Sequence, residues 1–332
     1  MSGRDQQASA PPRVYTRRQA IGRVAATSAA ALAALGLGAG LLGRRDRSSG
    51  VERRVIRDHR VARSAGAVEL AIARGPDAAA NVRRAIAALG GIEAFVRRGE
   101  SVAIKPNVGW NRLAEQAANT NPEVVAEVVR LCLGAGSGAV WVTDYSVNDP
   151  ERCFVRSGIA AAASAAGARV VLPDKSGFRE VAAGGEILQA VDVLWPLVDA
   201  DRVINLPCVK QHGLSLATLS LKNWYGAIGG HRVRLHQDIH RSIVDLAALF
   251  KPTLTVLDAT RVLTANGPSG GSLDDVERLD TVAAGVDEVA LDAWGCTLLG
   301  LVPTDVGFVA EAQRRGLGRA DFRSLRVEEI AG

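Results

Sequence analysis

The sequence predicts a layered α/β fold, in which a mostly parallel sheet carries helices on both faces. Short runs rich in valine, isoleucine and leucine alternate along the chain with alanine-rich segments of helical length. Strands that alternate with helices pair in parallel through right-handed crossovers. A hydrophobic fraction of 48% and a charged fraction of 23% are typical of a globular protein, which excludes a chain that is disordered throughout.

The expected elements follow one another in regular alternation. The strands are apolar runs that end in polar or turn residues, and they cover 102–108, 139–146, 169–174, 201–210 and 254–259. The helices have an apolar face or terminal signals, and they cover 121–136, 150–168, 237–250, 287–300 and 308–318. In the first helix, Asn121 is the expected N-cap, Pro122 suits the first position, and Gly134 and Gly136 end it.

Residues 1–50 have the features of a targeting signal rather than of a folded domain. The pair Arg17-Arg18 precedes a run of alanine, glycine and leucine over 24–42, and this arrangement resembles a twin-arginine export signal. It predicts contact with the twin-arginine export machinery and an extracytoplasmic, periplasmic location. Because a run of this length can also span a bilayer, an uncleaved membrane anchor is the alternative. Residues 51–66 are the expected tether, and 67–332 the single α/β domain.

The net charge of +5 is unevenly distributed. Residues 1–63 contain 13 arginines and four acidic residues, whereas the rest contains 27 basic and 31 acidic residues. The N-terminal part is therefore strongly basic and the body mildly acidic, so a nucleic-acid partner is not expected. Only five of the 40 basic residues are lysines.

Charged residues stand at the carboxyl ends of five expected strands. They are Lys105, Asp144, Asp174, Lys210 and Asp258. In an open α/β sheet, ligands bind beyond the carboxyl ends of the strands. A chain that leaves a core must become polar in any case, but lysines and aspartates together on one edge favour a site for a polar ligand.

The segment 205–240 holds four of the five histidines and two of the five lysines. Lys210 and His212 leave a strand together. Lys222 follows in a helical stretch rich in serine and leucine that ends at Gly226, so its amine must reach either an anion or, by snorkelling, water.

Two further features are open to two interpretations. His236 and His240 are four residues apart and would share a helix face, which suits either a metal or a plain helix surface. The loop around Asn266-Gly267 has backbone N–H groups that could hold an anion, or it is an ordinary turn.

Several familiar sites are absent from the sequence. The glycines at 134, 136 and 138 end a helix and precede a strand, which is the reverse of the dinucleotide-binding order. The sequence contains no CxxC pair, so no iron–sulfur or zinc-ribbon motif is encoded. Its four cysteines could include a disulfide in an oxidising compartment, or they are four buried thiols.

Five stretches together resemble the family known as domain of unknown function 362. They are VAIKPNV at 102–108, VKQHGLSLATLSLKNWYG at 209–226, the helix over 240–246, LTVLDATRVLTANGPSGG at 254–271 and AAGVDEVALDAWG at 283–295. The resemblance extends over about residues 100–300. Many members carry an appended ferredoxin-like module, whose cysteine motif this sequence lacks, and the family implies a fold and a site without a settled reaction.

The resemblance singles out polar residues that overlap with the strand-end set. They are Lys105, Asn107, Lys210, His212, Lys222, Asn223, His240, Asp258, Asn266, Gly267, Asp287 and Asp292.

These residues predict an exported protein that takes a small anionic ligand. The expected ligand-binding residues are Lys105, Asn107, Lys210, Asn223, Asn266 and Gly267. The expected acid–base or catalytic residues are His212, His240, Asp258 and Lys222. A divalent metal would be held by His240, Asp258 and Asp292. The alternatives to an enzyme are a non-catalytic binding or cofactor-carrying protein of the cell envelope and an iron–sulfur-associated redox partner.

Overall fold

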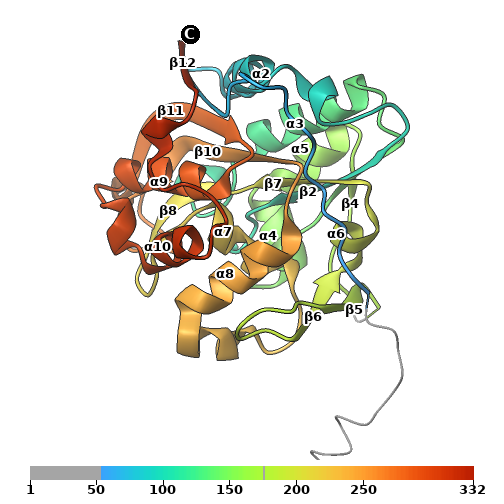
Figure 1. The fold of residues 1–332 in the computed structure, drawn as a ribbon, viewed down its shortest axis with the longest axis vertical. Helices are drawn as coiled ribbons and strands as arrows, with labels where there is room; N and C mark the ends of the chain where they lie inside the picture. The colour runs from blue at the N-terminus through green and yellow to red at the C-terminus, as the bar shows by residue number, and fades with distance from the viewer. Residues whose placement is uncertain (1–53, 175) are drawn as a thin grey trace, which may run out of the picture. The chain divides into compact units, whose positions relative to one another are not determined.

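The computed structural model describes residues 54–174 and 176–332, which are coloured in Figure 1. The expected export signal or anchor over 1–50 therefore lies outside the described residues. Of the expected tether, the residues from Arg54 onward lie against the domain. His59 is buried, and its backbone carbonyl accepts a hydrogen bond from Thr253 Oγ1 at 2.9 Å.

A ten-stranded mixed sheet forms the centre of the described part of the chain. Its strands are β1 (Leu70–Arg74), β2 (Ser101–Pro106), β3 (Ala139–Val142), β4 (Arg169–Val170), β7 (Arg202–Leu206), β8 (Cys208–His212), β9 (Leu216–Thr218), β10 (Leu254–Leu263), β11 (Val276–Gly285) and β12 (Val327–Ala331). The order is β12-β1-β11-β10-β7-β2-β3-β4, and β8 pairs with β10 and β9. A separate antiparallel hairpin joins β5 (Phe178–Ala182) and β6 (Ala190–Leu194).

Most strand pairs are parallel, as the sequence predicts. The pairs β2·β3, β2·β7, β3·β4, β10·β7, β10·β8 and β1·β12 run parallel. The pairs that run antiparallel are β11 with β1 and with β10, and β9 with β8. The first half of β11 is more exposed than the second and its sequence is polar, so the sequence does not predict a buried strand there.

Helices cover both faces of the sheet, which confirms the expected layering (Figure 1). One face packs against α2 (Ala78–Ala88), α3 (Pro122–Gly134), α4 (Pro150–Arg156) and α5 (Ile159–Ala165). The other packs against α6 (Trp195–Asp199), α7 (Ser220–Asn223), α8 (Ile239–Phe250), α9 (Glu288–Leu298) and α10 (Gly307–Arg314). Because side chains alternate along a strand, β2 places Val102 and Ile104 in the first core and Ala103 in the second.

Two expected elements are each divided in two. The helix expected over 150–168 breaks at Gly158, whose φ of 78° is the left-handed conformation that glycine tolerates. The strand expected over 201–210 breaks at Pro207, which has no N–H for a sheet ladder. The Asn121 cap is confirmed, since its side chain accepts the N–H of Glu123 at 3.0 Å.

The four cysteines are all free and buried, which confirms the interpretation as buried thiols. Among the residues that the structure describes, no helix combines the length and the apolar character needed to cross a membrane.

Candidate functional site

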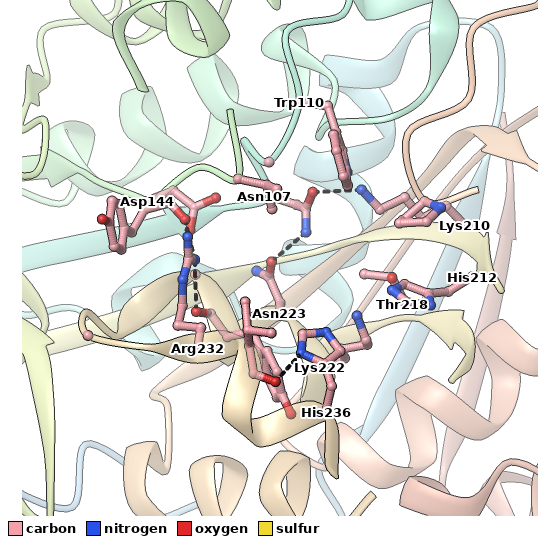
Figure 2. A pocket seen from close by; sticks show the side chains of 18 of the residues that line it. Asn107, Trp110, Asp144, Lys210, His212, Thr218, Lys222, Asn223, Arg232 and His236 are labelled. Atoms are coloured by element: carbon pink, nitrogen blue, oxygen red, sulfur yellow. Dashed lines mark hydrogen bonds between the residues drawn. The ribbon is translucent and has the colours of Figure 1, made fainter. Parts of the chain in front are cut away.

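A cavity of about 540 Å³ lies at the carboxyl ends of β2, β3 and β8 (Figure 2). Its floor comes from these strands and from α7. Its walls include the 3₁₀ helices Trp224–Ala227 and Arg232–Asp238, together with Pro268 from the loop after β10. The cavity therefore lies at the sheet edge where the sequence places the polar strand ends.

The deepest charged groups at this edge are a buried ion pair. Lys105 at the end of β2 and Asp144 just after β3 lie on neighbouring parallel strands, with Nζ 2.7 Å from Oδ1. Their side chains are 0% and 3% exposed. Asp144 Oδ2 also accepts the backbone N–H of Val108 at 2.6 Å. Burial lowers the pKa of Lys105, and the charge of Asp144 opposes that shift.

Gly226 packs directly on this ion pair. A Cβ atom at that position would overlap Asp144 Oδ1 and would lie 2.9 Å from Lys105 Nζ. The absence of a side chain at Gly226 thus allows the 3₁₀ helix to close over the pair.

We expect Gly226→Ala to lower the free energy of unfolding by about 1–3 kcal/mol, because the added methyl group must displace one partner of a buried pair. Urea denaturation measures the effect. Gly213→Ala is the matched control, since a Cβ there meets nothing within 4 Å. Equal stability of the two variants would contradict this packing.

A chain of side-chain amides leads from the cavity into the protein. Lys210 Nζ donates to Asn107 Oδ1 at 2.9 Å, and Asn107 Nδ2 donates to Asn223 Oδ1 at 3.0 Å (Figure 2). Asn223 Nδ2 donates to Asn205 Oδ1 at 2.8 Å, and Asn205 Nδ2 donates to Glu288 Oε1 at 2.6 Å. The chain begins on a cation and ends on a carboxylate, so all three amides point the same way.

Lys210 is buried and has only neutral hydrogen-bond acceptors. Besides Asn107 it donates to the carbonyl of Ala118, and among the described residues no carboxylate forms an ion pair with it. Burial lowers the pKa of its ammonium group. A buried cation without a counter-ion favours the approach of an anion.

Arg232 extends over the cavity from the second 3₁₀ helix. Its guanidinium lies 4.2 Å from the ring centroid of Tyr145 and donates to the carbonyls of Tyr145 at 2.6 Å and Ser146 at 2.8 Å. Within the described chain these hydrogen-bond partners are neutral and Arg232 forms no ion pair. Burial lowers the pKa of its guanidinium, and the charge of Asp144 opposes that shift.

The amine of Lys222 faces the cavity without a hydrogen-bond or ion-pair partner among the described residues. Lys222 is 8% exposed, and its Nζ lies 5.5 Å from the ring centroid of Tyr225. Burial, with a smaller contribution from the charge of Lys210, lowers its pKa to about 7.

His212 faces the same cavity as a neutral donor. Its Nδ1 accepts the backbone N–H groups of Leu214 at 3.1 Å and Ser215 at 3.4 Å, so the ring proton is on Nε2. Burial first, and then the charges of Lys222 and Lys210, lower the pKa of His212 to about 3. The imidazole therefore presents an N–H to a ligand without carrying a charge.

His236 and His240 do not share a face as the spacing predicts, because they belong to different elements. His236 lies in the 3₁₀ helix Arg232–Asp238 and lines the cavity. His240 lies in α8, where its ring stacks at 6.4 Å on Phe308. A pair that chelates a metal through one helix face is thus not formed.

Asp258 and Asp292, expected as metal or catalytic groups, bind backbone N–H groups instead. Asp258 Oδ2 accepts from Asn121 N at 2.7 Å at the start of α3. Asp292 accepts from Ser220 N at 2.7 Å and Leu221 N at 3.0 Å at the start of α7. The described residues contain no group of three or more His, Cys, Asp or Glu that could hold a metal ion, so His240, Asp258 and Asp292 do not form one.

The loop after β10 also differs from the expected anion cradle. The N–H of Gly267 donates to Gln211 Oε1 at 2.8 Å, and Asn266 Nδ2 donates to Asp275 Oδ1 at 3.0 Å. These two residues fix the loop, and Pro268 is the neighbour that reaches the cavity. Asp287, which the family resemblance adds, caps α9 through Ala290 N at 3.0 Å.

Of the expected site residues, the structure gathers Asn107, Lys210, His212, Lys222 and Asn223 at the cavity, with Lys105 directly behind. Sequence reasoning missed several cavity-lining residues, namely Trp110, Tyr145, Thr218, Tyr225 and Arg232. Most lie in connections outside the strands. The cluster of Arg232 with two histidines after a pair of glycines is the one signal that pointed toward them.

The fold and the cavity together define an α/β protein with a cavity lined by basic side chains at the strand ends. The model of the family "Domain of unknown function (DUF362)" matches residues 102–297, and this chain belongs to that family. The match includes every residue of the cavity wall.

A thylakoid-associated protein of Synechocystis sp. is 28% identical over 246 residues, which cover 72% of this chain and 75% of that protein. Two solved structures resemble the fold. The lactate racemase apoprotein from Thermoanaerobacterium thermosaccharolyticum has a TM-score of 0.41 at 12% identity, over 73% of this chain and 58% of that one. A Thermotoga maritima protein has a TM-score of 0.40 at 14% identity, over 69% and 60%. The chain thus spans less than two thirds of either structure's length.

Proposed function

We propose that this protein binds a small anionic ligand in the cavity at the strand ends. The observation that carries the proposal is the excess of cations there. Lys210, Lys222 and Arg232 form no ion pair with a carboxylate among the described residues. The acidic side chain in the wall is Asp144, which pairs with Lys105 and whose single charge also acts on Lys210 and Arg232. A bound carboxylate or phosphate would compensate charges that are costly to bury alone.

The remaining wall limits the class of ligand. Trp110, Tyr145 and Tyr225 supply apolar surface beside the cations. A volume of about 540 Å³ is in the range of small-molecule sites. These properties favour a compact organic anion over a bare inorganic ion.

We further propose export by the twin-arginine route, with the anchor over 24–42 as the alternative form of attachment. The support is the Arg17-Arg18 pair before an Ala/Gly/Leu-rich run, together with the similarity to a protein described as thylakoid-associated. Both favour a membrane-associated or extracytoplasmic location.

The ligand site is tested with a panel of small carboxylates, inorganic phosphate and sugar phosphates, by calorimetry on the folded chain. Lys210→Met should weaken the best-binding anion by about 10- to 100-fold, since a hydrogen bond from a charged group contributes about 1.5–3 kcal/mol. Lys251→Met is the control, because it removes the same charge from an exposed position. Parent-like affinity in both Lys210→Met and Lys222→Met would refute the proposed site.

A further inference from the structure

We propose that Lys222 forms an imine with the carbonyl carbon of a small oxo acid held in this cavity. The inference rests on the proposed anion site and gives it a substrate class: a carboxylate that carries a neighbouring ketone or aldehyde.

The first argument is the contrast among the amines at the site. Lys105 is committed to Asp144 at 2.7 Å, and Lys210 donates to Asn107 and to a backbone carbonyl. The amine of Lys222 has no such partner within the described chain and faces the cavity beside the ring of Tyr225. An amine held away from water, next to a second cation, is the arrangement that activates a lysine as a nucleophile.

The second argument is that the nucleophile needs a free lone pair. An ordinary lysine is uncharged in only about one molecule in several thousand at pH 7. Burial of Lys222 lowers its pKa to about 7, so roughly half of the molecules carry the neutral amine at that pH.

The third argument is that the other groups complement an oxo acid. Lys210 and Arg232 can hold its carboxylate. His212 presents a fixed Nε2–H, which can donate a hydrogen bond to the carbonyl oxygen of the oxo acid. Because its pKa is about 3, His212 stays neutral and does not take the proton that Lys222 releases. Trp110 and Tyr145 provide the apolar wall against which a short carbon chain packs.

The step balances without any other reactant. The lone pair of Nζ attacks the carbonyl carbon and the C=O π electrons move to oxygen, which takes up a proton from the nitrogen to give a carbinolamine. The nitrogen lone pair then expels the hydroxyl group, which leaves as water with the second N–H proton. The products are one C=N bond to Lys222 and one molecule of water.

The test is reductive trapping on the full chain. The protein is incubated with glyoxylate or 2-oxobutyrate and sodium cyanoborohydride, and the adduct is measured by intact mass and located by peptide mapping. The chain has only five lysines, so the position is assigned directly. We expect a single adduct on Lys222, at least tenfold more abundant than on the exposed Lys251, and none with acetate, which has no carbonyl carbon of this kind.

Lys222→Arg keeps the cation but cannot form the imine. We expect it to lose the adduct, whereas Lys251→Arg, outside the cavity, should keep both the adduct on Lys222 and the binding of oxamate, an unreactive analogue, in calorimetry. If the parent binds oxamate and forms no adduct, or if Lys251 is labelled as fast as Lys222, the imine proposal is wrong and the anion site stands. If the parent binds neither oxamate nor the other anions, the anion site itself fails, and the imine proposal with it.

Discussion

Asp144→Asn is expected to lower the free energy of unfolding by about 3–5 kcal/mol at pH 7. The substitution keeps the shape of the side chain but removes the charge that lies 2.7 Å from Lys105 Nζ. Lys105 is fully buried, so water cannot replace the lost partner. What remains for its ammonium group is the carbonyl of Pro106 at 3.0 Å and Asn223 Oδ1 at 3.2 Å.

Urea denaturation of the parent and the variant measures this loss. Asp174→Asn is the matched control, because Asp174 also follows a strand of this sheet but is exposed, and its loss should change stability by less than about 0.5 kcal/mol. The double variant Lys105→Met/Asp144→Asn should recover most of the loss, since no buried charge is left unpaired. If Asp144→Asn lowers the free energy of unfolding by no more than Asp174→Asn does, the Lys105–Asp144 pair does not stabilise this part of the fold.

Anion affinity is expected to fall as the pH rises above 7, by up to about tenfold per pH unit. A nearby anion favours the charged form of Lys222, so binding above the pKa of the free amine must take up a proton. Below pH 7 the amine is already charged, and the affinity should be flat. Calorimetry at pH 6, 7, 8 and 9 measures the profile.

Lys222→Arg should hold its affinity across this range, because arginine keeps its charge, and Lys251→Met should keep the slope of the parent. Stability gives an independent check. The pKa of Lys222 is about 7 in the folded chain and 10.5 when unfolded, so between these values the unfolded chain holds the proton that the folded chain has released. The free energy of unfolding should therefore rise with pH from 7 to 10.5, and this rise should be smaller in Lys222→Met. Identical profiles of anion affinity against pH in the parent and in Lys222→Arg would exclude Lys222 from the site.

The sequence was sufficient to predict the parallel half of the sheet and the edge that carries the cavity. Lys105 and Lys210 were predictable because a lysine at the end of an apolar run needs either a protein partner or a ligand to compensate its charge. His212, Lys222 and Asn223 followed because they lie within a short segment that returns to the same edge.

The roles of the residues that were expected to bind a metal could not be predicted from the sequence. Asp258 and Asp292 lie in apolar surroundings, as metal ligands do, but each caps the start of a helix from a distant part of the chain. A sequence pattern does not show which backbone N–H groups will come within reach. For the same reason Arg232 was missed, since its position over the cavity depends on a 3₁₀ helix folding back toward the residues after β3.

The row of amides from Lys210 to Glu288 behaves as a single polar unit. No member can turn over alone, because a reversed amide would set two donors or two acceptors against each other at both of its neighbours. At the far end of the row, Glu288 also accepts from Trp224 Nε1 at 3.1 Å and Thr255 Oγ1 at 3.0 Å. The acceptor-only carboxylate of Glu288 on α9 thereby fixes the direction of all three amides, so that Asn107 Oδ1 faces Lys210 at the cavity.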